Sequence, residues 1–88
     1  MQQHHQLKPS LLLTEKSDQL FVLDKDTGRV HEFNVTAKVI FQLFLEPRSV
    51  DEAVEAFART FEIEEEQARE DVTEMLDHFR TNDLLATG

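Results

Sequence analysis

The stretch VHEFNVTAKVIFQLFL, residues 30–45, decides the fold because its hydrophobic period changes halfway along. Val30 and Phe33 stand in a short mixed run that is typical of a strand. After Asn34 the apolar residues recur every three or four positions, as they do on one face of a helix. These helical positions are Ala37, Ile40, Phe41, Phe44 and Leu45. With Asn34 or Thr36 as its N-cap, the stretch predicts a strand that leads directly into the central helix of a core.

Two further strands are expected on the N-terminal side of this stretch. Apolar runs at residues 11–13 and 20–23 are separated by polar residues. The segment DKDTG, Asp24 to Gly28, predicts a turn, because Asp side chains accept hydrogen bonds from nearby N–H groups and Gly28 can adopt a positive φ. It should join an antiparallel pair of strands. Residues 1–10 show no such pattern, so we expect a flexible N-terminal tail followed by one domain at residues 11–86.

Two more helices are expected on the C-terminal side. Pro47 ends the first helix, and Ser49 with Glu52 forms a capping box that begins the second. The inward positions of the second helix are Val50, Val54, Phe57 and Phe61. The acidic residues 64–66 open a third helix, which Asn82 can end in a left-handed conformation. Its inward positions are Ala68, Val72, Met75, Leu76 and Phe79. Strands followed by helices predict an α+β domain, with a three-stranded antiparallel sheet and then three helices.

Composition limits the classes of protein to which the chain can belong. Its 88 residues allow one small core, and the absence of cysteine excludes disulfides and thiolate metal sites. No long apolar run and no signal-peptide pattern is present, so we expect a cytoplasmic protein that does not enter membranes. The net charge is −9, and all of it comes from residues 46–88, which hold thirteen acidic and four basic residues. Such a charge disfavours nucleic acids and anionic membranes as partners.

No catalytic pattern is recognisable in the sequence. A glycine-rich phosphate loop and a His-Glu-x-x-His motif are both missing, so we expect neither an enzyme nor a cofactor. His4 and His5 are expected to be solvated rather than to bind a metal, while His31 and His78 should pack or face solvent. The acidic residues of the third helix are expected mostly on its outer, solvated face. They are Glu70, Asp71, Glu74 and Asp77.

The segment VHEFNVTA, residues 30–37, resembles the junction of the last strand and first helix in PqqD-like proteins, which are RiPP recognition elements. Further segments resemble the second helix, the third helix and the exit from it. They are residues 49–54, 61–63, 71–72 and 75–85. The order and spacing of these segments carry the resemblance, which extends over residues 11–86.

The resemblance implies a winged-helix-like chaperone without catalytic activity. Similar proteins bind the leader of a ribosomally made precursor peptide as an antiparallel strand added to the third strand, in a groove against the third helix. They present it to a modifying enzyme such as a radical SAM protein, a cyclase or a leader peptidase. The edge-strand residues would be Arg29, Val30, His31, Glu32 and Phe33. The third helix would contribute Arg69, Val72, Met75, Leu76 and Phe79, with Met75 and Phe79 as the foremost groove residues.

Two other functions compete with peptide recognition. A winged-helix regulator would bring several basic residues of its third helix to DNA, but residues 64–82 hold seven acidic residues against Arg69 and Arg80. DNA binding is therefore disfavoured. A small adaptor that docks on an enzyme without binding a leader stays open, and so does a homodimer formed by exchange of strands or helices.

Overall fold

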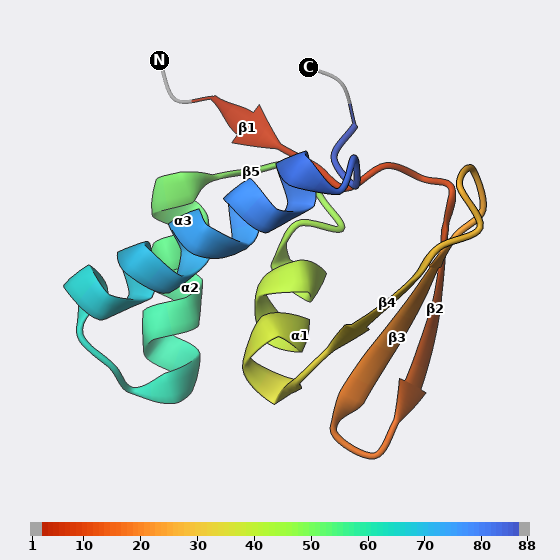
Figure 1. Ribbon diagram of the computed structural model, residues 1–88. Helices are drawn as coiled ribbons and strands as arrows, with labels where there is room; N and C mark the ends of the chain where they lie inside the picture. The colour runs from red at the N-terminus through yellow and green to blue at the C-terminus, as the bar shows by residue number, and fades with distance from the viewer. Residues whose placement is uncertain (1–2, 87–88) are drawn as a thin grey trace.

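The computed structural model describes residues 3–86, in which a three-stranded antiparallel sheet is followed by three helices and packs chiefly against the first of them (Figure 1). The sheet has the order β2-β3-β4, from β2 (Leu11–Lys16), β3 (Gln19–Asp24) and β4 (Val30–Phe33). The helices are α1 (Val35–Leu43), α2 (Val50–Phe61) and α3 (Glu65–Thr81). A separate antiparallel pair joins β1 (His4–His5) to β5 (Arg48–Ser49). The predicted α+β class is confirmed.

The turn between β3 and β4 forms where the sequence predicts it. Gly28 has φ +77° and donates its N–H to the Asp24 carbonyl over 2.7 Å. The Asp24 carboxylate accepts a hydrogen bond from the Asp26 N–H (2.9 Å). Asp24 is fully buried, and its other oxygen lies 2.9 Å from Lys8 Nζ. The hydrogen bond with this ammonium lowers the pKa of Asp24, so the carboxylate that organises the turn stays charged.

The predicted helix starts are confirmed in atomic detail. Asn34, rather than Thr36, caps α1, because its side-chain oxygen accepts the Ala37 N–H over 2.9 Å. Ser49 and Glu52 form the predicted capping box at the start of α2, with both reciprocal hydrogen bonds present (3.1 and 2.9 Å). These side chains satisfy backbone donors that a helix N-terminus otherwise leaves unpaired.

The predictions for two helix ends were wrong in detail. α1 ends at Leu43, before Pro47, and Leu45 therefore lies past the helix with 42% of its surface exposed instead of in the core. At the end of α3 the left-handed residue is Asp83 (φ +58°), while Asn82 has φ −97°. The Asn82 side chain instead donates to the His78 carbonyl (2.8 Å), which satisfies one of the last acceptors of α3.

Phenylalanine rings join the sheet to the helices in the core. Phe41 of α1 lies 5.2 Å from Phe33 of β4 and 5.6 Å from Phe79 of α3, measured between ring centroids. All three side chains are buried, and Phe44 and Phe57 extend the cluster toward α2. Because β4 and α3 share these rings, the edge strand and the third helix are held in a fixed relation.

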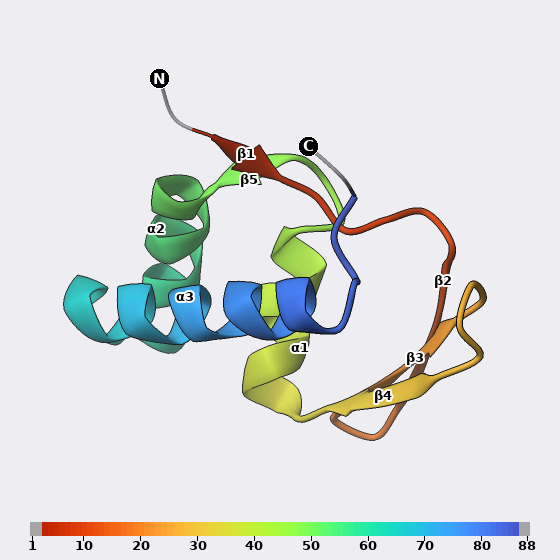
Figure 2. The same cartoon turned by 45° about the horizontal axis from the view of Figure 1, so that its top comes forward.

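The expectation of a flexible tail at residues 1–10 was wrong for residues 3–10, the part that the structure describes. β1 pairs with β5, and the chain then runs past α1 to β2 (Figure 2). Leu7 is only 4% exposed and donates its N–H to the Phe44 carbonyl over 2.8 Å. Leu7 also forms an antiparallel bridge with Leu85, which ties this segment to the C-terminal end of the domain. Residues 1–2 lie outside the described residues.

Candidate functional site

β4 is an edge of the three-stranded sheet, as its sequence predicted. Asp24 donates its N–H to the Arg29 carbonyl (2.8 Å), which fixes the hydrogen-bonding alternation along the hairpin. In this alternation the backbone groups of His31 and Phe33 point toward β3. Those of Val30 and Glu32 point away from β3, toward the open edge. The strand therefore offers two residues with backbone donors and acceptors that the sheet does not use.

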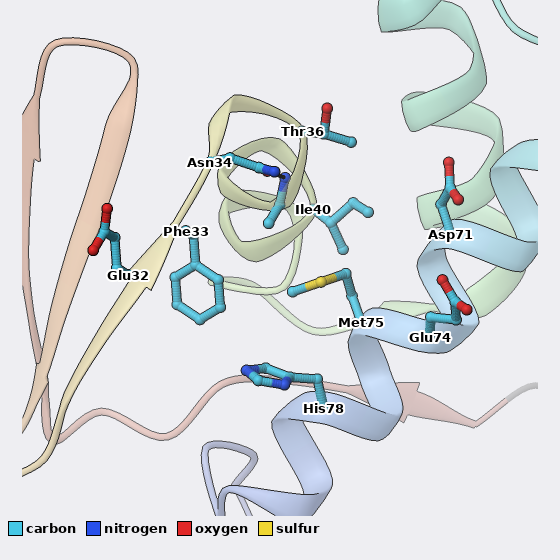
Figure 3. A pocket seen from close by; sticks show the side chains of 10 residues that line it. Glu32, Phe33, Asn34, Thr36, Ile40, Asp71, Glu74, Met75 and His78 are labelled. Carbon is cyan, nitrogen blue, oxygen red and sulfur yellow. Dashed lines mark hydrogen bonds between the residues drawn. The ribbon is translucent and has the colours of Figure 1, made fainter.

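A groove of about 390 Å³ lies beside this edge, between β4, the start of α1 and one face of α3 (Figure 3). It is lined by Glu32, Phe33, Asn34, Thr36, Ala37, Ile40, Asp71, Glu74, Met75 and His78. The four residues from α3 follow the spacing i, i+3, i+4 and i+7, so they form one stripe along the helix. The groove thus has the strand edge on one side and a helix stripe on the other.

The middle of the groove is apolar. Figure 3 shows Met75 reaching from α3 toward Ile40 of α1 and His78 reaching toward Phe33 of β4. The rings of Phe33 and His78 meet edge to face, with their centroids 5.9 Å apart. Ile40 and Phe33 are buried, whereas Met75 is half-buried and its flexible thioether can adapt to different side chains. This surface suits an apolar side chain of a ligand.

Two carboxylates border the groove on its α3 side. Asp71 and Glu74 stand on the α3 side in Figure 3. Glu74 is exposed and Asp71 is half-buried, so the expectation of a mostly solvated face holds, and these two carboxylates also border the groove. They lie one and four residues before Met75, which places all three on the same stripe of α3. Glu32 is directed away from Met75 in the same view, and it accepts a hydrogen bond from the Gln19 side chain (2.8 Å).

The structure divides the predicted α3 residues between the groove and other places. Met75 lines the groove, while Val72, Leu76 and Phe79 are buried core residues. The expectation that Phe79 is a foremost groove residue is corrected, because its ring has no exposed surface and packs on other phenylalanines. Arg69 stands outside the groove lining.

Four of the five predicted edge residues lie in β4, and Arg29 precedes it. Phe33 and Glu32 line the groove, while Val30 is 64% exposed on the opposite face of the sheet from Phe33. Arg29 precedes β4 and is exposed. His31 lies half-buried on the Phe33 face, where its Nε2 has no hydrogen-bond partner among the described residues. Burial, together with repulsion from His78, lowers the pKa of His31, so the ring is neutral near pH 7.

The basic residues of α3 are engaged with carboxylates. Arg69 lies 2.9 Å from Asp51 of α2 and 3.5 Å from Glu65, and Arg80 lies 3.0 Å from Asp77. A helix of this kind repels phosphate, which agrees with the sequence argument against DNA binding. Within residues 3–86 no three metal-binding side chains gather into a potential site. No helix in this range is long and apolar enough to cross a bilayer.

Three solved structures share this fold. The first, TbiB1 in complex with the TbiA(beta) leader peptide, has a TM-score of 0.82 at 17% identity, covering 94% of this chain and 96% of that one. The second, lasso peptide synthetase B1 complexed with the leader peptide, has a TM-score of 0.79 at 20% identity, covering 94% and 98%.

The third is the solution NMR structure of the PqqD truncation of Methylobacterium extorquens PqqCD, described as a functional and stand-alone RiPP recognition element. Its TM-score is 0.76 at 14% identity, covering 96% of this chain and 89% of that one. No curated protein matches the chain. The family model described as coenzyme PQQ synthesis protein D (PqqD) matches residues 19–85. That range covers most of the chain and contains both β4 and α3, and the chain therefore belongs to the PqqD family.

Proposed function

We propose that this protein binds the leader of a ribosomally made precursor peptide as an additional strand on β4. The observation that carries the proposal is the open edge of β4 beside a groove whose far side is α3. Two structures with the same fold are complexes with leader peptides. Strand addition needs both parts of this arrangement, because main-chain hydrogen bonds give affinity and side-chain pockets give selectivity.

Binding uses groups that are already in place. An antiparallel peptide strand would exchange hydrogen bonds with the outward N–H and C=O groups of Val30 and Glu32. Every second side chain of that strand would then face the groove, where Met75 and Ile40 offer an apolar surface. Since the shared phenylalanine core fixes β4 against α3, little reorganisation is required on binding.

The bound precursor would be presented to a separate modifying enzyme, which is a radical SAM protein, a cyclase or a leader peptidase. In this role the protein is a non-catalytic chaperone, and the side chains that line its groove bind rather than react. Precursor and enzyme meet where both are synthesised, which places the protein in the cytoplasm. A homodimer formed by exchange of strands or helices is a further proposal, and one that paired through the β4 edge would compete with leader binding.

The test titrates a candidate leader from a neighbouring gene into ¹⁵N-labelled protein. We expect amide shifts at residues 29–34 and along the groove face of α3, residues 71–78. Val30→Pro removes an N–H that points to the open edge and leaves the β3 ladder intact, so it should weaken binding while the protein stays folded. Val30→Thr, which keeps the N–H, is the matched control.

Two results would refute the proposal. One is a set of shifts confined to α1 and α2, away from the edge. The other is equal affinity of the Val30→Pro and Val30→Thr proteins. An enzyme that binds this protein while no candidate leader does would instead support the adaptor function.

A further inference from the structure

We propose that the peptide bound along β4 carries a lysine or arginine shortly before the apolar residue that enters the groove. This inference rests on the proposed function and specifies the chemistry of its ligand. It is carried by two carboxylates, Asp71 and Glu74, which stand beside the apolar middle of the groove on the same α3 stripe as Met75.

The local charge of the groove favours a cation. None of the residues that line the groove is a lysine or an arginine. Glu74 is exposed and makes no hydrogen bond or ion pair within residues 3–86, and Asp71 only accepts one hydrogen bond, from the Gln67 side chain (3.0 Å). Arg69, the nearest base along α3, is engaged with Asp51 and Glu65. The two carboxylates are therefore uncompensated by any cation of the lining.

One feature of the groove carries a partial positive charge, and this charge is weaker than that of the carboxylates. The N-terminus of α1 borders the groove, and a helix N-terminus favours anions with roughly half a unit charge. The Asn34 side chain already accepts the Ala37 N–H there, which satisfies one of the free donors. Two full carboxylates outweigh this partial charge, so the net preference of the groove is for a basic side chain.

The order of the basic and the apolar residue along the peptide follows from the direction of the bound strand. In Figure 3 the α3 stripe runs from Asp71, near the α1 end of the groove, to His78 beside Phe33. Because β4 runs toward α1, a peptide antiparallel to β4 enters from beyond Phe33, on the side of Asp71 and Glu74, and then passes Met75 and His78. Four helical residues, from Asp71 to Met75, span about 6 Å, which about two strand residues also cover. The basic residue should thus precede the apolar residue by one to three positions.

The charge contact should act mainly on selectivity and on the rate of association. The carboxylates are accessible to water, so one ion pair with the ligand adds a modest, salt-sensitive gain in affinity. Opposite charges steer encounter, and an acidic residue placed at the same position of the peptide is repelled. The groove would in this way reject leaders of the wrong charge that still carry a suitable apolar residue.

The experiment selects binders from a displayed library of random twelve-residue peptides, using the whole protein. Enriched sequences are synthesised, and their affinity is measured for the wild type, Glu74→Lys and a matched control, Glu46→Lys. Glu46 lies in the loop after α1 with a side chain 81% exposed, and its replacement changes the net charge equally. Circular dichroism verifies that both variants fold, and amide shifts verify that the peptides occupy the groove.

We expect Lys or Arg to be enriched one to three positions before an apolar residue. Glu74→Lys should weaken these peptides roughly two- to fivefold, the upper part of the range of one exposed charge contact, and Glu46→Lys should leave their affinity almost unchanged. Groove-bound peptides without a basic preference, or equal losses in both variants, would overturn the inference while the proposed function stands. If all selected peptides bind away from β4 and α3, both this inference and the proposed function are overturned.

Discussion

Replacement of Leu7 by alanine tests whether the N-terminal segment is part of the folded domain. Leu7 is 4% exposed, so nearly all of its side chain is removed from water on folding. Alanine lacks three of its carbon groups, worth about 2.4 kcal/mol at about 0.8 kcal/mol each. A cavity that does not collapse would raise this cost within the usual range of about 2–5 kcal/mol. We therefore expect the free energy of unfolding to fall by about 2–3 kcal/mol.

Such a loss is large for a domain of this size. At about 4–8 °C for each kcal/mol, the midpoint of thermal unfolding should fall by about 10–20 °C. Urea titration followed by circular dichroism measures the free energy directly. Leu12→Ala is the matched control, because Leu12 is 53% exposed and the same truncation there should cost well under the Leu7 value. If the two variants agree within about 0.5 kcal/mol, the packing of residues 3–10 against the domain is refuted.

Three further predictions follow from the fold and the site. Ser49→Ala removes the hydroxyl of the α2 capping box and should lower the free energy of unfolding by about 0.5–2 kcal/mol in urea titrations, whereas no change would show that the box is not formed in solution. Phe79→Ala should cost about 3–5 kcal/mol of stability, while Met75→Ala should cost far less and chiefly weaken peptide binding; the reverse pattern would exchange their roles. Burial lowers the pKa of His31 and His5, so the unfolded chain binds more protons just below their ordinary pKa and stability should fall as pH drops from about 7 to about 5. His31→Gln should reduce this pH dependence in urea titrations, and an unchanged dependence would exclude His31 as a source.

Local signals in the sequence were sufficient for most of the fold. The Asp24 to Gly28 turn, the Asn34 cap and the Ser49 capping box each depend on residues within a few positions of one another, and each formed as predicted. The edge position of β4 also followed, because it is the last strand before the helices. These features are decided by backbone donors and acceptors that only nearby side chains can satisfy.

Features that depend on contacts between residues far apart in the sequence could not be predicted from local patterns. Leu7 is one apolar residue among polar ones, and its burial depends on Phe44 and Leu85, which lie far away in sequence. The division of α3 between core and groove was also hidden, since Phe79 and Met75 belong to the same apolar stripe in the sequence. The positions of α1 and β4 against α3 decide that Phe79 is buried in the core and that Met75 lines the groove.

The pairing of β2 with β3 has a consequence for where this domain can be cut. The family match begins at residue 19, after β2, whereas the structure places β2 against the full length of β3. A chain shortened to the matched residues would lose Leu7 and β2, and the sheet would be reduced to the β3–β4 pair with the β2 side of β3 exposed. The newly exposed side of β3 would offer free backbone groups to any extended peptide, including copies of the fragment. The β3–β4 pair that presents the binding edge is thus stabilised and shielded by a strand that lies away from the proposed ligand.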